Sequence, residues 1–211
     1  LMRALIPLVL TSIMLFSPMS AMAAVQDAVL AGGCFWCLEH DLEDVEGVIS
    51  AESGYSGGHV ENPTYQQVSG EKSGHQEVVR VRFDSDKISY SNLLQHYWRN
   101  IDPLDGQGQF CDRGDSYRSV IFTAGEQQAT AAQSSAASAA SELGVSKSKI
   151  KVQIRDAVQF WPAEDYHQDY ANNNELRYRY YRCSCGRDRR LDAVWGERAR
   201  SGTAWATPVA P

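Results

Sequence analysis

The feature that most restricts the fold is the passage from residue 28 to residue 49. A short apolar run over residues 28–30 leads into Gly32-Gly33 and Cys34. Apolar residues then recur at spacings of four, three and four, as Leu38, Leu42, Val45 and Ile49. Such spacing places side chains on one face of a helix. The pattern therefore predicts that a strand turns into a helix at Cys34.

The following segments alternate between loop, strand and helix signals. Residues 53–74 are rich in Gly, Ser, Asn and Pro, which predicts a long ordered loop. Residues 77–83 alternate as in a strand, and Glu77 shares its face with Val79, Val81 and Phe83. The further predicted elements are a helix at 91–101, a strand at 119–123, a helix at 126–143, a strand at 150–154 and a short helix at 163–170.

This order of elements predicts an α/β fold, an α+β sandwich in which helices pack on one mixed sheet. The core would resemble a loop-rich, ferredoxin-like set of split βαβ units. With 211 residues, of which 43% are hydrophobic, the chain can build one core and has little material for a second. We expect one domain over residues 24–200 and a disordered tail over residues 201–211.

Residues 1–23 have the pattern of a secretory signal peptide. Arg3 precedes an apolar stretch over residues 5–16, and Ala21-Met22-Ala23 is a small-residue cleavage pattern. We expect an exported protein, periplasmic or secreted. The alternative is a retained membrane anchor, but Ser12 and Pro18 interrupt the stretch, which is shorter than the roughly 20 residues that span a bilayer.

The charge of the chain limits its partners. The formal net charge is −6, which argues against a general nucleic-acid binder. Within this acidic total, residues 175–190 are locally basic. We interpret this segment as a solvated face, and the alternative is a docking patch for an acidic redox partner.

Five cysteines are an odd number, so at least one thiol cannot be in an intramolecular disulfide. A helix N-terminus lowers the pKa of a cysteine placed there, which would make Cys34 reactive. Cys37 lies one turn later and could form a redox disulfide with Cys34. The alternative is a zinc site completed by Cys183 and Cys185, although their one-residue gap is shorter than usual for paired ligands.

Glu77 is the acidic residue of most interest. A carboxylate on an apolar strand face is costly to ionise, so its pKa should rise and it could act as a general acid near neutral pH. The alternative is an edge position that is open to water.

Seven motifs occur in order between residues 27 and 170. They are Gly33-Cys34-Phe35-Trp36, Gly54-Tyr55-Ser56-Gly57-Gly58, Asn62-Pro63-Thr64-Tyr65, Gly74-His75-Gln76-Glu77-Val78-Val79, Asp112-Arg113-Gly114, Tyr117-Arg118-Ser119 and Ala163-Glu164-Asp165-Tyr166-His167-Gln168. With these motifs the chain resembles the peptide methionine sulfoxide reductase A family.

The resemblance implies a role for each matching residue. Cys34 would attack the sulfur of methionine S-sulfoxide, and Glu77 would protonate the departing oxygen. Tyr65 and Tyr117 would donate hydrogen bonds to that oxygen, and Asp112 would help to order the pocket. Phe35 and Trp36 would form the apolar wall for the substrate methyl group. His167 and Gln168 match a family motif, for which we expect structural support.

The resemblance also implies a catalytic cycle. Methionine would be released, and Cys34 would remain as a sulfenic acid. A resolving cysteine would then form a disulfide with Cys34. Cys185, which precedes Gly186, resembles a C-terminal resolving cysteine of part of the family. Our order of preference is Cys185, then Cys37, then Cys183.

The same resemblance sets the expected partners. A thioredoxin-type dithiol would restore the thiols, with no metal and no bound organic cofactor. The substrates would be oxidised proteins or peptides, and we expect a monomer. Cys111 stands where the family usually has Asn, and it is either a further resolving candidate or a small core residue.

Two other functions are compatible with these residues. A general thiol-disulfide oxidoreductase would use Cys34 and Cys37 and would need no acid at Glu77. A non-enzymatic binding module would hold zinc with its cysteines and a peptide with its aromatic residues.

Overall fold

The computed structural model describes residues 25–206. The strands are β1 (Val25–Ala31), β2 (Val48–Ser56), β3 (Gln76–Asp84), β4 (Gly108–Gln109), β5 (Asp112–Arg113), β6 (Val120–Thr123), β7 (Gln153–Asp156) and β8 (Phe160–Pro162). The α-helices are α1 (Phe35–Glu43), α2 (Tyr65–Ser69), α3 (Tyr90–Trp98), α4 (Gly125–Glu142), α5 (Tyr170–Asn173), α6 (Glu175–Cys185) and α7 (Arg187–Trp195). Short 3-10 turns lie at Asp115–Tyr117, Lys147–Lys149, Asp165–His167 and Gly196–Arg198.

Six strands form one mixed sheet in the order β7-β6-β1-β3-β2-β8. The pair β6 and β7 is parallel, and the other neighbouring pairs are antiparallel. The strands β4 and β5 form a separate two-stranded hairpin. The predicted fold class, a mixed sheet with helices packed on it, is confirmed.

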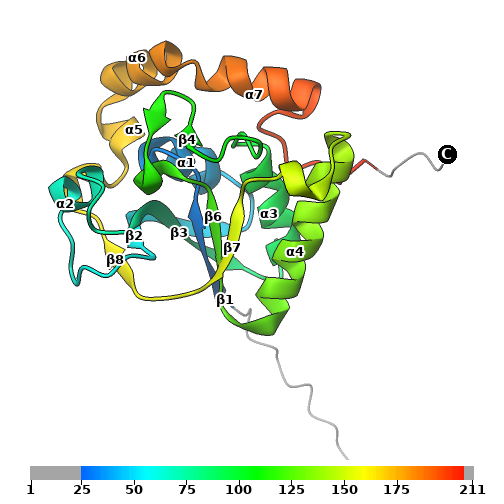
Figure 1. The fold of residues 1–211 in the computed structure, drawn as a ribbon, viewed down its shortest axis with the longest axis horizontal. Helices are drawn as coiled ribbons and strands as arrows, with labels where there is room; N and C mark the ends of the chain where they lie inside the picture. Colours follow the sequence, from blue (N-terminus) through cyan, green and yellow to red (C-terminus); the bar gives the residue numbers. More distant parts are fainter. Residues whose placement is uncertain (1–24, 207–211) are drawn as a thin grey trace, which may run out of the picture.

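The main core lies between the sheet and the helices α1, α3 and α4. It contains Leu38 and Leu42 of α1, Leu94 and Trp98 of α3, and Ala136 of α4, all packed with strand residues. Figure 1 shows α6 and α7 running across the end of the molecule where α1 and β4 lie. The C-terminal helices therefore cover the end of β1, where Cys34 follows.

Two predictions made around Cys34 and Glu77 are confirmed. The strand β1 ends at Ala31 and α1 begins at Phe35, so Cys34 occupies the N-cap position of the helix. The strand β3 buries Glu77, which is 2% exposed, together with Val79 and Val81. Glu77 is therefore not at a position open to water.

The predicted loop over residues 53–74 is wrong at its beginning, where β2 was missed. Ser53, Gly54 and Ser56 lie in β2, and a Cβ on Gly54 would come within 2.4 Å of the Phe160 ring. Small residues are thus needed here because β8 packs closely, not because the chain forms a loop. The short helix α2 also lies within the predicted loop.

Two predicted helices are too long. The first ends at Glu43, because the chain turns through Gly47 at φ 95° into β2 and leaves Ile49 54% exposed. In place of a helix over 163–170 there is a 3-10 turn at Asp165–His167, followed by α5. Asp169, at φ 49°, separates the two.

The two ends of the chain carry further predictions. The predicted signal peptide lies outside the described residues, as do residues 207–211 of the predicted tail. Residues 201–206 have no helix or strand, and the Arg99 side chain donates to the Ser201 and Thr203 carbonyls. Within residues 25–206, none of the helices combines the length and hydropathy needed to cross a bilayer.

Candidate active site

Cys34 and Glu77 meet at the first turn of α1. The Phe35 backbone N–H donates to Glu77 Oε2 at 3.0 Å. Because β1 pairs with β3, the Glu77 carboxyl group on β3 reaches the start of α1, the helix that follows β1. The structure thus brings the predicted nucleophile and the predicted acid into one buried site, where Glu77 binds the N–H of the residue that follows Cys34.

The prediction that the helix N-terminus lowers the pKa of Cys34 is wrong. Cys34 is 6% exposed, and its burial raises the pKa of the thiol well above the ordinary value. Contact with Cys37 and the charges of Glu77 and Asp112 raise it further. The Cys34 side chain does not cap the helix, and Glu77 binds the first free N–H instead.

Cys37 has the opposite shift. The hydrogen bond from the Cys34 thiol lowers the pKa of Cys37, burial opposes this, and the cation of Arg187 lowers it further. Cys34 and Cys37 are both free thiols, 6% and 1% exposed. The pair is therefore in contact but unbonded in this state.

Glu77 has the electrostatic character predicted for a general acid. Burial raises its pKa to about 8, although the bond from the Phe35 N–H opposes the shift. Asp112 adds to the rise through its negative charge. Glu77 is thus largely protonated at neutral pH.

Two phenols converge on the same place. Tyr65 and Tyr117 are both half-buried, and their side chains contact each other. Burial raises the pKa of Tyr65 to about 12 and also raises that of Tyr117, and the charges of Glu77 and Cys34 act on both. The two O–H groups are thus available as donors beside the nucleophile.

Phe35 and Trp36 both contact His167. The Trp36 indole N–H donates to His167 Nδ1 at 2.9 Å, and the Phe35 ring lies 5.0 Å from the His167 ring. Trp36 also stacks on Tyr170, with 3.7 Å between ring centroids. Burial lowers the pKa of His167, which keeps Nδ1 free to accept. His167 therefore fixes the orientation of Trp36, a role that sequence reasoning missed.

Glu164 and Gln168 join this site to β2, the strand next to the edge strand β8. Glu164 accepts from the Tyr65 backbone N–H at 2.9 Å and from the Tyr55 hydroxyl at 2.8 Å. The Gln168 side chain accepts from the Ser53 N–H and donates to the Ser53 carbonyl, both at 2.9 Å. These bonds give the expected structural support and hold α2, and thus Tyr65, in place.

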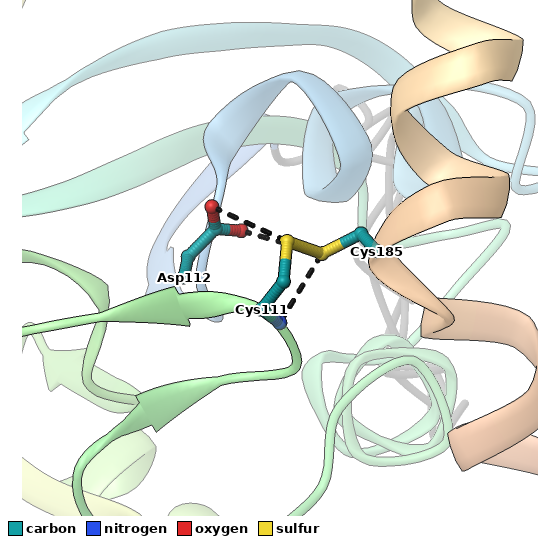
Figure 2. A group of neighbouring side chains, drawn as sticks. All are labelled: Cys111, Asp112 and Cys185. Atoms are coloured by element: carbon teal, nitrogen blue, oxygen red, sulfur yellow. Dashed lines mark hydrogen bonds between the residues drawn. A yellow bond between two sulfur atoms is a disulfide. The ribbon is translucent and has the colours of Figure 1, made fainter.

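A disulfide joins Cys111 to Cys185, and Asp112 lies beside it (Figure 2). Cys111 Sγ is 3.8 Å from Asp112 Oδ1, and Cys185 Sγ is 4.0 Å from Oδ2. The Tyr181 hydroxyl donates to Asp112 Oδ2 at 2.5 Å. The alternative that Cys111 is a small core residue is wrong, because Cys111 is exposed at the tip of the β4–β5 hairpin.

The interpretation of residues 175–190 as a solvated face is wrong for two arginines. The Arg182 guanidinium binds Asp41 at 2.7 Å, and Arg187, which is 1% exposed, lies 3.5 Å from Asp41. Arg187 also donates to the Asn100 carbonyl at 2.8 Å. Both side chains turn inward because Asp41 of α1 is buried beneath them, and a count of charges along the chain cannot show this.

The four cysteines of the zinc alternative are not gathered. Within residues 25–206, the side chains close enough to share a metal ion are Cys111, Asp112 and Cys185, with ligand atoms within 4.8 Å of one another. Cys183 is free and exposed, and Cys185 is bonded to Cys111. The predicted alternative ligand set is therefore wrong.

Comparison with known proteins gives one consistent result. The family model described as "Peptide methionine sulfoxide reductase" matches residues 26–199. A relative from Caulobacter vibrioides, named peptide methionine sulfoxide reductase MsrA 2, is 51% identical over 85% of this chain and 90% of its own length. A relative of the same name from Rhizobium meliloti is 48% identical over 86% of this chain and 89% of its own length.

Two solved structures have a similar fold. One is reduced Mxr1 from Saccharomyces cerevisiae, with a TM-score of 0.67 and 26% identity, covering 72% of this chain and 86% of that one. The other is methionine sulfoxide reductase A of Corynebacterium diphtheriae, with a TM-score of 0.66 and 29% identity, covering 74% and 78%.

Proposed function

The chain belongs to the peptide methionine sulfoxide reductase family, and we propose that it reduces methionine S-sulfoxide in proteins with Cys34 as nucleophile and Glu77 as acid. One observation carries this assignment of roles. The Glu77 carboxyl group binds the N–H of the residue that follows Cys34, so one small buried site holds both the nucleophile and the proton.

The surrounding side chains supply the remaining requirements of the reaction. The sulfoxide oxygen gains negative charge as Cys34 attacks, and the phenols of Tyr65 and Tyr117 are placed to donate to it. The indole of Trp36, fixed by His167, and the ring of Phe35 offer an apolar wall for the methyl group. Asp112 orders the Tyr181 side of the pocket.

The attack requires the Cys34 thiolate, although burial favours the thiol. The Cys37 sulfur accepts the hydrogen bond of the Cys34 thiol, and Arg187 favours negative charge on Cys37. Cys37 is thus the group placed to take the proton of Cys34 when substrate arrives. This role would explain a second cysteine one turn after the nucleophile.

The sulfenic acid left on Cys34 needs a resolving thiol. Cys185 remains our first choice, because its sulfur lies beside Asp112, whose charge also acts on Cys34. Cys37 is the second candidate. Cys183 is the third, because it is exposed on another side of α6. A thioredoxin-type dithiol would then reduce the disulfide, and neither a metal nor a bound cofactor takes part.

Replacing Tyr65 or Tyr117 by Phe tests the proposed pocket. Each variant should lower kcat for a methionine sulfoxide peptide by about 10²–10³, the usual cost of losing one donor to a developing charge. Steady-state kinetics with dithiothreitol as reductant measure this effect. The matched control is Tyr180→Phe, since Tyr180 is 77% exposed and should keep the parent rate. An unchanged kcat in both site variants would remove the two phenols from the mechanism.

We also propose that the enzyme acts on exported proteins, in the periplasm or outside the cell. The support is the signal-peptide pattern of residues 1–23. Mass spectrometry of the protein isolated from its cells should find an N-terminus at Ala24. A cytoplasmic protein that retains residues 1–23 would contradict this proposal.

A further inference from the structure

The Cys111–Cys185 disulfide occupies a position between the buried site and the surface. Cys34 is 6% exposed, whereas Cys111 is exposed and Cys185 half-buried. Cys185 also lines a surface pocket of about 340 Å³ with Phe110, Arg113 and Arg189. A partner dithiol can therefore reach this disulfide far more readily than it can reach Cys34.

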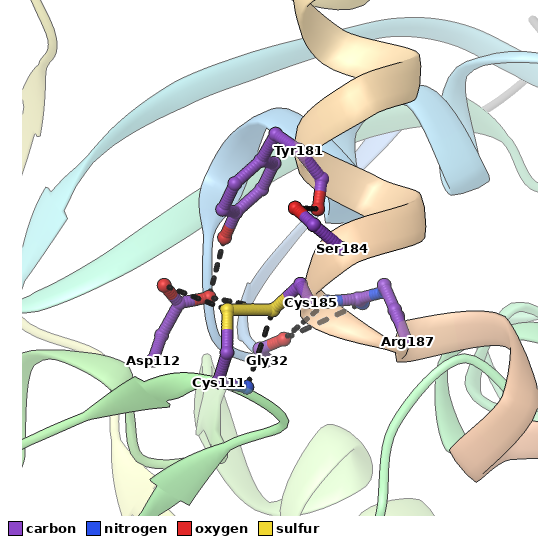
Figure 3. The surroundings of a disulfide bond; sticks show 7 residues. All are labelled: Gly32, Cys111, Asp112, Tyr181, Ser184, Cys185 and Arg187. Atoms are coloured by element: carbon purple, nitrogen blue, oxygen red, sulfur yellow. Dashed lines mark hydrogen bonds between the residues drawn. A yellow bond between two sulfur atoms is a disulfide. The ribbon is translucent and has the colours of Figure 1, made fainter.

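A residue close to each half of the disulfide packs against the backbone that leads into Cys34. Arg187, two residues after Cys185, lies 3.5 Å from the Gly32 carbonyl (Figure 3). A Cβ on Gly33 would come within 2.6 Å of the Gln109 side chain, two residues before Cys111. The segments that carry the two cysteines thus pack against the residues directly before the nucleophile.

The hairpin that carries Cys111 is shaped to present it to α6. Phe110 adopts a left-handed conformation at φ 57°, and the Arg187 guanidinium lies 4.5 Å above its ring. On the other side, α6 ends at Cys185 because Gly186 is left-handed, at φ 69°. One arginine therefore positions the hairpin tip and the end of α6 together.

From this arrangement we infer that Cys111 is a redox-active residue of the catalytic cycle, which receives the oxidation from Cys34 through Cys185 and holds it at the surface. The inference rests on the proposed function and adds a step after it. Cys111 is thus the residue that returns Cys34 to the thiol state.

The proposed cycle has four steps. Cys34 takes the sulfoxide oxygen and becomes a sulfenic acid, and methionine leaves. The Cys185 thiol attacks Cys34, which forms the Cys34–Cys185 bond and releases water. The Cys111 thiolate then attacks Cys185, which forms the Cys111–Cys185 bond and releases the Cys34 thiolate. Finally, an external dithiol reduces Cys111–Cys185 and becomes a disulfide itself.

The test is a count of methionine formed without reductant. All proteins carry Cys183→Ser, which removes the exposed free thiol, and they are reduced with dithiothreitol, freed of it and mixed with excess methionine sulfoxide peptide. The protein with Cys111 intact should form two methionines per chain. The first is stored as Cys111–Cys185 and the second remains as oxidised Cys34.

The Cys111→Ser protein should form one methionine and stop as the Cys34–Cys185 disulfide, which peptide mass mapping identifies. The Cys185→Ser protein should also form one. Cys37→Ser should still form two, however slowly, because Cys37 does not carry the oxidation in this scheme.

Three results would overturn the inference while leaving the proposed function intact. They are a single methionine from the protein with Cys111 intact, two from Cys111→Ser, and a Cys111–Cys185 bond that persists after reduction while turnover continues. A protein that forms no methionine at all, even with dithiothreitol present, would instead contradict the proposed function.

Discussion

Cys34→Ser should abolish the reduction of methionine sulfoxide peptides. A serine hydroxyl is not ionised in this site and cannot hold the transferred oxygen as a sulfenic acid. The loss should reach about 10⁴-fold or more in kcat, since removal of a nucleophile acts on this scale. The measurement is the rate of methionine formation with dithiothreitol as reductant, which makes resolving cysteines unnecessary.

The matched control for this variant is Cys183→Ser. Cys183 is also a free thiol, but it is exposed on α6. With dithiothreitol it should keep the parent rate. Parent activity in Cys34→Ser would show that another thiol performs the attack.

Glu77→Gln should lower kcat/KM by about 10²–10⁴, the range that general acid catalysis contributes. Glutamine keeps the shape of the protonated acid and can still approach the Phe35 N–H with its carbonyl oxygen, but it has no proton to give. In the parent enzyme, activity should fall as pH rises through about 8, because Glu77 loses its proton there. A general thiol-disulfide oxidoreductase would need no such acid, so any disulfide-reducing activity should survive Glu77→Gln. Unimpaired sulfoxide reduction by Glu77→Gln would remove Glu77 from the mechanism.

Glu39→Gln is the control for Glu77→Gln. Glu39 is also 2% exposed, and burial raises its pKa to about 7, but its partners are Ser53 and Asp169 rather than Cys34. The variant should keep the parent kcat. An equal loss in both variants would mean that any buried carboxyl change disturbs the site.

Denaturation measured at a series of pH values provides a second test of the protonation state of Glu77. Its pKa is about 8 in the folded protein against an ordinary 4.5, so the folded state holds a proton that the unfolded state has lost. Glu77 should therefore make the free energy of unfolding decrease as pH rises from about 4.5 to about 8. Glu77→Gln should weaken this decrease, and an unaltered pH dependence would contradict a buried, protonated Glu77.

The sequence predicted those elements that bury apolar residues on one face of a strand or along one side of a helix. The β3 strand, the α4 helix and the strand-to-helix turn at Cys34 belong to this group. The β2 strand was missed because close packing by β8 selects small residues there, and small residues also mark loops.

The residues of the candidate site could be predicted from the sequence, but the direction of their pKa shifts could not be predicted in every case. Position at a helix start suggested a lowered pKa for Cys34, yet burial and the capture of the Phe35 N–H by Glu77 raise it. The inward turn of Arg187 depends on Asp41, which lies 146 positions earlier in the sequence. The Cys111–Cys185 pairing likewise joins a hairpin to a distant helix, and no local spacing encodes it.

The most direct test of the central claim uses a protein in which Cys34 is the sole cysteine, with Ser at positions 37, 111, 183 and 185. After reduction and removal of dithiothreitol, it is mixed with methionine sulfoxide peptide and a sulfenic acid trap, then analysed by peptide mass spectrometry. We expect one methionine per chain and the trap attached to Cys34, however slow the reaction. Methionine formed while Cys34 stays an unmodified thiol would contradict the account.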